Sequence, residues 1–164
     1  LGSEEKVKQL SENPVWITGI GQKTISAGFT KNISFSSMES TKLAGQSALK
    51  MADKNIENID VAEIHDAFSV CEPMALESLG FSKNGKGMNT IKELHDTDNF
   101  KINPRGGLIG TGHPLGATGI AQTIEITQQL QSNAGNRQTE NPQMGLVHNM
   151  SAAATSSTVL VLEK

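Results

Sequence analysis

A dense run of glycines around one histidine constrains this chain more than any other feature of its sequence. Residues 103–119, Asn-Pro-Arg-Gly-Gly-Leu-Ile-Gly-Thr-Gly-His-Pro-Leu-Gly-Ala-Thr-Gly, contain six of the sixteen glycines and the imidazole of His113. Glycine weakens helices and strands, so such a run predicts a loop whose backbone takes positive φ or approaches another group closely. Because this density of glycine serves no ordinary core, we interpret His113 as a functional residue.

The segment after His113 has the pattern of a helix. Pro114 fixes the backbone directly after the histidine, and residues 117–131 carry apolar side chains at helical spacing. The apolar positions are Ile120, Ala121, Ile124 and Leu130, and they predict an amphipathic helix. The histidine therefore lies on a loop that leads into a helix N-terminus, where amide donors and the helix dipole favour developing negative charge.

Size, charge and cysteine content narrow the function classes. With 164 residues the chain can build a core of its own, and we expect a single domain over residues 1–164. A net charge of −3 and only two arginines, Arg105 and Arg137, argue against a nucleic-acid surface. No apolar run is long enough to span a membrane. The lone Cys71 and a polar N-terminus without a signal sequence predict a protein of the reducing cytoplasm.

Strand and helix patterns alternate along the chain. β-Branched and apolar runs predict strands over residues 15–21, 60–64, 101–103, 144–148 and 158–162. Helical spacing predicts helices over residues 41–54, 68–79 and 117–131, with Ser40 as the N-cap of the first and Gly80 just after the second. Pro73 fits only in the first turn of the second helix, which therefore starts near residues 69–71. We interpret residues 81–100 as a polar surface insertion with a short helix at 90–95. The alternation predicts an α/β fold: a mixed, mainly parallel sheet of about five strands with helices on both faces.

Three of the four histidines follow predicted strands. His65 ends the second strand, His113 follows the third and His148 ends the fourth, whereas His95 lies in the insertion and receives no role. Sites in α/β sheets form at the carboxyl ends of strands, so we expect these three imidazoles there. For His65 two interpretations stay open, a site residue or a polar loop residue. Adjacent strand side chains point in opposite directions, so Asp66 is better suited to capping the next helix than to orienting His65.

Two other chemistries are weaker. Cys71 could be a thiol nucleophile, but cysteine is among the most buried residue types and a helix-interior position lacks access, so we interpret it as a core residue. A metal site built from the histidines and Cys71 would lack the CxxC or HxxxH spacing of common metal sites. We therefore predict neither a metal nor a resident cofactor.

Three motifs carry a resemblance to a known family. His-Asp-Ala-Phe at 65–68, Gly-His-Pro-Leu-Gly-Ala-Thr-Gly at 112–119 and His-Asn at 148–149 stand in the order seen in the C-terminal half of thiolases. The chain resembles most the archaeal acetyl-CoA acetyltransferase and sterol-carrier-protein thiolase branch, from about Pro14 to Leu162. Related ketosynthases share a histidine here, usually without the following proline, so thiolase is preferred.

The resemblance implies Claisen condensation and its reverse, thiolysis, on acyl-CoA thioesters, which are substrates rather than cofactors. It implies that His113 activates a cysteine nucleophile and helps form an oxyanion hole, and that His65 helps polarise the second thioester oxygen. These roles suit an imidazole, which titrates near neutrality and can both accept and donate a proton. By the same resemblance, the residues expected to contact the bound acyl-CoA are Gly112, Pro114, Phe68 and Asn149.

The chain departs from the family pattern at three points. The nucleophilic cysteine belongs to the N-terminal half of a thiolase, and Cys71 does not match its motif. Many members of this branch have a cysteine where this chain has Ala67, so we assign the second proton transfer to His148. The glycine-rich turn expected after His-Asn is replaced by Ser-Ala-Ala-Ala at 151–154, whose Cβ atoms would narrow the pocket.

Two functions follow as alternatives. The first is the C-terminal half of a thiolase, inactive until joined by an N-terminal half or partner subunit, in an enzyme that is a homo-oligomer. The second is a non-catalytic thiolase-like module that binds acyl-CoA or serves in assembly, as Ala67 and the turn at 151–154 suggest. Either way, we expect an apolar helix face that is exposed when this half is alone, and self-association through it.

Overall fold

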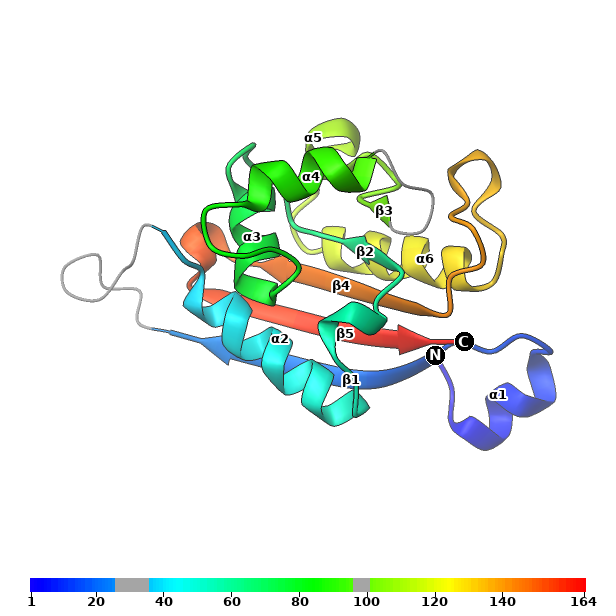
Figure 1. Cartoon of the computed structure of the whole chain (residues 1–164). Coiled ribbons are helices and arrows are strands. Elements are labelled where there is room, and N and C mark those ends of the chain that lie inside the picture. Colours follow the sequence, from blue (N-terminus) through cyan, green and yellow to red (C-terminus); the bar gives the residue numbers. More distant parts are fainter. Residues whose placement is uncertain (26–35, 96–100) are drawn as a thin grey trace.

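Five strands form one mixed sheet in the part of the chain that the structure describes. The structure is a computed structural model that describes residues 1–25, 36–95 and 101–164. The strands are β1 (Trp16–Thr24), β2 (Val61–Glu63), β3 (Lys101–Ile102), β4 (Met144–Met150) and β5 (Ser156–Glu163), in the order β1-β5-β4-β2-β3 (Figure 1). β5 runs antiparallel to both β1 and β4, and β4, β2 and β3 are parallel. Four strands thus share one direction, which confirms the predicted mixed, mainly parallel sheet.

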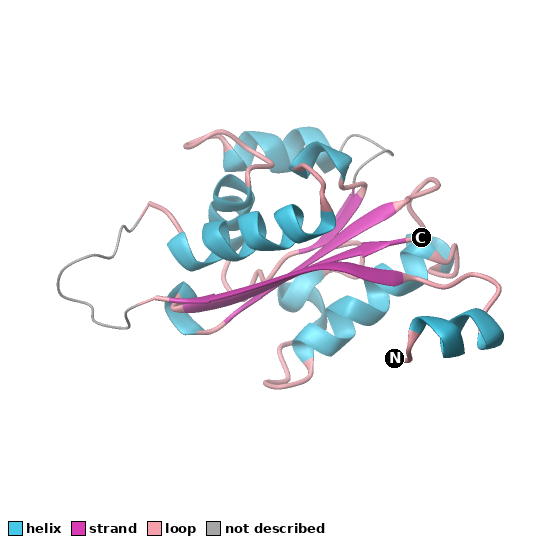
Figure 2. Cartoon of the chain, turned by 90° about the horizontal axis from the view of Figure 1, so that it is seen from below, coloured by secondary structure: helices cyan, strands magenta, loops and turns pink. Residues whose placement is uncertain are grey.

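Helices cover both faces of this sheet, as predicted (Figure 2). One face carries α2 (Glu39–Ala52), with α3 (Cys71–Leu79) packed on α2 and α4 (Gly87–His95) packed on α3. The other face carries α6 (Thr118–Leu130), which contacts β4 and β2. The shorter elements are α1 (Glu4–Leu10), α5 (Gly107–Thr111) and the 3-10 turns η1 (Ile56–Asn58), η2 (Gly135–Arg137) and η3 (Ala152–Ala154). Neither α1 nor α5 is indicated by the sequence pattern.

Alternation along the strands divides the core into two apolar clusters. In β2, Val61 packs with α6, while Ala62 packs on the α2 side. The α2 side is close-packed because Gly19 and Gly21 of β1 lie against the helix backbone, where a Cβ at either glycine would overlap a carbonyl oxygen of α2. This close approach explains why β1 contains two glycines, although glycine has a low β propensity.

The start of α2 differs from the sequence prediction, whereas that of α3 agrees with it. Helix α2 begins at Glu39 after Met38, so Ser40 is inside the helix and is not its N-cap. The Ser40 hydroxyl instead donates to the carbonyl of Ala154 at 2.6 Å. Helix α3 begins at Cys71 and ends at Gly80, which has φ of 97° as a C-terminal glycine should. Of the predicted insertion, residues 81–95 contain α4, while residues 96–100 lie outside the described part.

Helix α6 presents part of its apolar pattern to solvent. Ile120 and Ile124 are 64% and 52% exposed, whereas Leu130 is buried. The helix turns a largely polar side to the sheet, consisting of Thr118, Gln122, Glu125, Ile126, Gln129 and Leu130. These polar groups have partners that periodicity cannot reveal, such as the bidentate pairing of Arg137 with Glu125 at 2.9–3.2 Å. Buried polar groups are tolerated where they are hydrogen-bonded, so these bonds allow the polar side of α6 to face the sheet.

Candidate active site

The glycine run forms α5, a tight loop and the start of α6. Four of its glycines, Gly106, Gly107, Gly112 and Gly116, have positive φ values of 102°, 63°, 86° and 85°. This confirms the expectation that the run provides backbone conformations that other residues rarely adopt. The loop places His113 at the surface, directly before the N-terminus of α6.

One hydrogen bond sets the ring of His113. Its Nδ1 lies 2.7 Å from the hydroxyl oxygen of Thr118, which itself donates to the carbonyl of Pro114 at 3.3 Å. Both contacts are hydrogen bonds only when the single Thr118 hydrogen goes to the carbonyl and its oxygen accepts the Nδ1–H of the histidine, which assigns this tautomer. The Nε2 atom of His113 is therefore the unprotonated nitrogen of the neutral ring, as a general base requires.

His65 meets His113 at the end of β2. The two ring centroids are 4.9 Å apart, and the planes are nearly perpendicular at 86°. His65 is 4% exposed. Burial, with a smaller contribution from a positive charge on His113, lowers the pKa of His65 to about 4, while the Asp66 carboxylate acts in the opposite direction. At neutral pH His65 is thus an uncharged imidazole with one N–H to donate.

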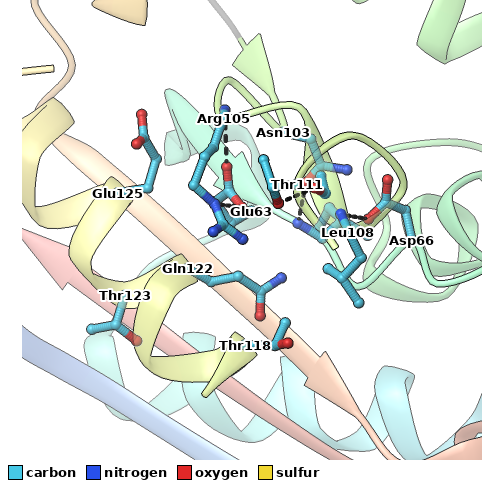
Figure 3. Close-up of polar contacts among 12 residues, drawn as sticks. Glu63, Asp66, Asn103, Arg105, Leu108, Thr111, Thr118, Gln122, Thr123 and Glu125 are labelled. Carbon is cyan, nitrogen blue, oxygen red and sulfur yellow. Dashed lines mark hydrogen bonds and ion pairs between the residues drawn. The ribbon is translucent and has the colours of Figure 1, made fainter. Parts of the chain in front are cut away.

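The end of β2 also holds the segment that leads to His113 (Figure 3). The Asn103 side-chain oxygen accepts the N–H of Ile64 at 2.6 Å, and the Glu63 carboxylate accepts the N–H of Arg105 at 3.3 Å. Asp66 accepts the N–H of Leu108, also at 2.6 Å. Asp66 therefore caps α5, far along the chain, rather than the helix that directly follows it. The sequence analysis missed this role, since a contact across 42 residues has no local signal.

Glu63 is a buried carboxyl on the α6 face of the sheet. Burial raises the pKa of Glu63 to about 7, and Arg105 opposes this through its backbone N–H and its charge. The Arg105 Nε atom lies 3.8 Å from a Glu63 oxygen, which is an ion pair but too long for a hydrogen bond. Figure 3 shows Glu63 and Arg105 together beside α6.

His148 is on the opposite side of the sheet from α6. Its Nε2 lies 3.1 Å from the Thr41 hydroxyl of α2, and its side chain is fully buried. Strand side chains alternate, so His148 faces α2 and the next residue, Asn149, faces α6. The structure brings His65 and His113 into ring contact, whereas the His148 ring lies on the α2 side of the sheet against Thr41. His148 remains close enough to His65 for the two rings to interact electrostatically.

A relay of hydroxyls determines the protonation of His148. The Ser40 hydroxyl donates to the Ala154 carbonyl, Ser157 lies 2.7 Å from Ser40, and Thr41 lies 2.9 Å from Ser157. With one hydrogen on each hydroxyl, every bond forms only if His148 donates from Nε2 to Thr41. Burial, and to a smaller extent the charge of His65, lowers the pKa of His148 to about 3, so the ring is neutral.

Three of the four residues expected to contact acyl-CoA are exposed to solvent. Phe68 is 71% exposed, and Gly112 and Pro114 are exposed too. Asn149 is half-buried, with its amide donating to Gln122 at 3.0 Å and its side chain against Gly119 at the start of α6. Asn149, not His148, is therefore the member of the His-Asn pair on the side of His113.

Cys71 is poorly suited as a nucleophile, and the described residues contain no candidate metal site. Cys71 is a buried free thiol, and burial raises its pKa, which disfavours the thiolate. Among the described residues no three His, Cys, Asp or Glu side chains are grouped to hold a metal ion. Within the same residues no helix is long and apolar enough to cross a bilayer.

The turn after β4 departs from ordinary backbone geometry. Ala153 and Ala154 take φ values of 55° and 51°, in the left-handed region that favours glycine. Residues 153 and 154 therefore keep a glycine-type backbone conformation although both are alanines.

Comparison with known proteins decides the family. Residues 21–164 match the family described as thiolase C-terminal domain-like. The chain belongs to this family. It is 32% identical over 162 residues to an acetyl-CoA acetyltransferase of Methanothermobacter thermautotrophicus, covering 98% of this chain and 42% of that protein. It is 43% identical over 112 residues to the sterol carrier protein 2 of Gallus gallus, covering 67% of this chain and 20% of that protein. The chain thus spans less than half the length of these relatives.

A solved structure shares the fold of this thiolase C-terminal domain. The Ltp2-ChsH2(DUF35) aldolase superposes with a TM-score of 0.84 at 20% sequence identity, over 98% of this chain and 42% of the aldolase chain. At that identity the likeness concerns the fold alone. The motifs of this chain, rather than its architecture, must therefore support any reaction assigned to it.

Proposed function

We propose that residues 1–164 form one domain, the C-terminal half of a thiolase, which acts in acyl transfer between coenzyme A thioesters. The observation that supports this most is the pairing of His113, whose Nε2 is free to accept a proton, with a neutral His65 at 4.9 Å. A base beside a neutral N–H donor is what attack on a thioester needs. The nucleophilic cysteine would come from an N-terminal half.

The proposed steps use the two histidines in turn. Nε2 of His113 takes the thiol proton of the partner cysteine, and the thiolate sulfur forms a bond to the thioester carbon. Coenzyme A then leaves with that proton, and an acyl-enzyme remains. In the second step Nε2 of His113, unprotonated again, takes the α-proton of the second acyl-CoA, while the N–H of His65 donates to its thioester oxygen, where negative charge develops. The α-carbon then forms a bond to the acyl carbon, and the cysteine sulfur leaves and takes the proton back from His113. His148 receives no step, since it is fully buried against α2.

The substrate would approach from the exposed surface around Phe68, Gly112 and Pro114, and the half-buried Asn149 would lie deeper in the site. Glycine at 112, with φ of 86°, lets a thioester lie close to the backbone. The proposal places the protein in the cytoplasm, where its single buried cysteine would stay reduced.

Assembly with an N-terminal half would cover exposed apolar side chains. Ile120 and Ile124 project from α6, and Ile109 and Leu115 are exposed in the segment before it. Large apolar side chains gathered on one helix and its approach are typical of an interface. We propose that the N-terminal half packs on this face and that the complete enzyme is a homo-oligomer.

Reconstitution tests the proposal. The chain is co-expressed with the N-terminal portion of the Methanothermobacter relative, and acetoacetyl-CoA thiolysis is followed by release of acetyl-CoA. Activity is expected only with both halves, and His113→Ala is expected to reduce it at least 100-fold without preventing assembly. A folded, assembled pair without activity would contradict the proposal.

A non-catalytic module is the second candidate. Ala67 in place of a cysteine and the strained alanines at 153 and 154 favour it. It predicts that His113→Ala leaves any turnover of the reconstituted pair unchanged while abolishing complex formation. The His113→Ala variant in the same assay therefore separates the two functions.

A further inference from the structure

Asp66 and His65 are neighbours in the chain, but their side chains serve different parts of the site. His65 turns its ring to His113, at 4.9 Å between centroids. Asp66 is 3% exposed and directs its carboxylate to α5, where Oδ1 accepts the N–H of Leu108 at 2.6 Å. A hydrogen bond to an ionised acceptor is short and about twice as strong as a neutral one.

The carboxylate occupies space that a larger residue at position 107 would need. Gly107 has φ of 63°, and a Cβ built on it would overlap both oxygens and the carboxyl carbon of Asp66. Asp66 thus fits against the bare Cα of Gly107 while it binds the next amide. Position 107 must be glycine for two independent reasons, its backbone angle and this contact.

Helix α5 connects this anchor to His113. The N–H of Gly112 donates to the Leu108 carbonyl at 2.9 Å, and the Thr111 hydroxyl donates to the Gly107 carbonyl at 2.6 Å. These bonds close a single helical turn, so a displacement at Leu108 is passed on to Gly112. His113 follows directly, and its ring is fixed on the other side by Thr118.

We propose that Asp66 is a positioning residue, whose carboxylate anchors α5 so that the ring of His113 meets the ring of His65. The His-Asp pair is then no catalytic dyad, because the aspartate acts on the base through α5 and not on the adjacent histidine. The kinetic consequence of this inference rests on the proposed function, whereas its structural consequence does not.

The structural test uses NMR of the chain itself. In the unaltered chain, cross-relaxation between the ring protons of His65 and His113 is expected. Asp66→Asn keeps an oxygen acceptor of the same size and should retain the cross-peak. Asp66→Ala should lose it or reduce it several-fold. A cross-peak of unchanged intensity in Asp66→Ala would overturn the proposal.

A matched control separates anchoring from stability. Asp60 also accepts backbone amides, those of Gln143 and Met144 at 2.8 and 3.0 Å, but at the other end of β2. Asp60→Ala should destabilise the chain to a similar extent and leave the ring contact unchanged. Loss of the contact in Asp60→Ala would overturn the specific role of Asp66.

A double-mutant cycle tests the contact with Gly107. Gly107→Ala is expected to lose the ring contact, because its Cβ displaces the carboxylate. In the Asp66→Ala background the same substitution meets free space, so its added effect on the ring contact and on the unfolding midpoint should be smaller. Equal effects in the two backgrounds would show that the carboxylate does not occupy this space, against the proposal.

Kinetics of the reconstituted pair complete the test. Asp66→Ala is expected to lower kcat 10- to 100-fold with KM within about twofold, since a misplaced base slows chemistry more than binding. Asp66→Asn should stay within about threefold of the unaltered pair. If the unaltered pair has no turnover, the proposed function fails, and the ring contact and the cycle still decide the role of Asp66.

Discussion

Thr118, the first residue of α6, accepts the Nδ1–H of His113 at 2.7 Å and so leaves Nε2 of that ring as the base. A threonine that begins a helix thereby determines which nitrogen of the preceding loop histidine can react. His113 is held at one side by this bond and at the other by α5. The orientation of the His113 ring is therefore set by residues of this chain.

Replacing the Thr118 hydroxyl should impair the base without removing it. Thr118→Val is similar in shape but cannot accept the Nδ1–H, so His113 loses its orientation and its preferred tautomer. We expect kcat of the reconstituted pair to fall about 10- to 100-fold. Thr123→Val is the control, because Thr123 donates to the Gly119 carbonyl on the same helix at 2.7 Å and does not touch His113. Equal losses in the two variants would contradict the assignment.

Acid should destabilise the chain through its buried imidazoles. The pKa of His148 is lowered to about 3 and that of His65 to about 4 in the folded state, mainly by burial, against 6.5 for an exposed histidine. The unfolded chain therefore binds these protons first, and stability falls as the pH drops from about 6.5 toward 4. We expect a loss of about 2 kcal/mol or more for each histidine by pH 4. Urea unfolding at several pH values measures it, and His65→Gln should reduce the slope.

Glu63 should make the folded chain less stable as the pH rises. Its pKa is raised to about 7 by burial, so the folded state keeps a proton that the unfolded chain releases above about 4.5. Its contribution to stability is full below pH 4.5 and is lost as the pH rises through 7. Glu63→Gln removes this loss, and its stability relative to the unaltered chain should improve by about 2 kcal/mol between pH 5 and pH 8. A difference that does not change with pH would contradict the buried acid.

Glycine should relieve the turn after β4. Ala153 is exposed and has φ of 55°, a conformation that costs an L-residue about 1–2 kcal/mol. The greater backbone entropy of unfolded glycine offsets part of the gain, so Ala153→Gly should raise stability by about 0.5–1 kcal/mol. Ala152→Gly, in the same turn but without a positive φ, should lower it by a similar amount. Thermal unfolding of both variants measures the two changes in stability. A loss of stability in Ala153→Gly as well as in Ala152→Gly would contradict backbone strain at Ala153.

The two faces of α6 should respond differently to polar substitution. Ile120→Gln with Ile124→Gln changes exposed side chains, so thermal stability should stay within about 0.5 kcal/mol. Self-association of the chain and capture of the N-terminal half should both weaken, as sedimentation measures. Ile126→Gln, on the fully buried side, should instead destabilise the fold by about 3 kcal/mol or more. If the exposed pair unfolds the chain as well, the assigned orientation of α6 is wrong.

Local patterns predicted most of the fold because they report local physics. The β-branched runs, the helical spacing and Gly80 mark elements whose conformation depends on near neighbours. The glycine run around His113 was recognised for the same reason, since positive φ is a property of single residues. The order of motifs in the chain, with no knowledge of contacts, was sufficient to indicate the family that the comparisons established.

What the sequence determined by itself was the succession of elements, the family and the two histidines at the centre of the site. Tertiary structure alone decided the rest. It turned α6 so that Ile120 is exposed, it placed His148 against Thr41, and it joined Asp66 to Leu108. The physical reason is common to all three. Which way a side chain faces, and which distant group satisfies a buried polar atom, depends on residues far along the chain that local periodicity does not contain.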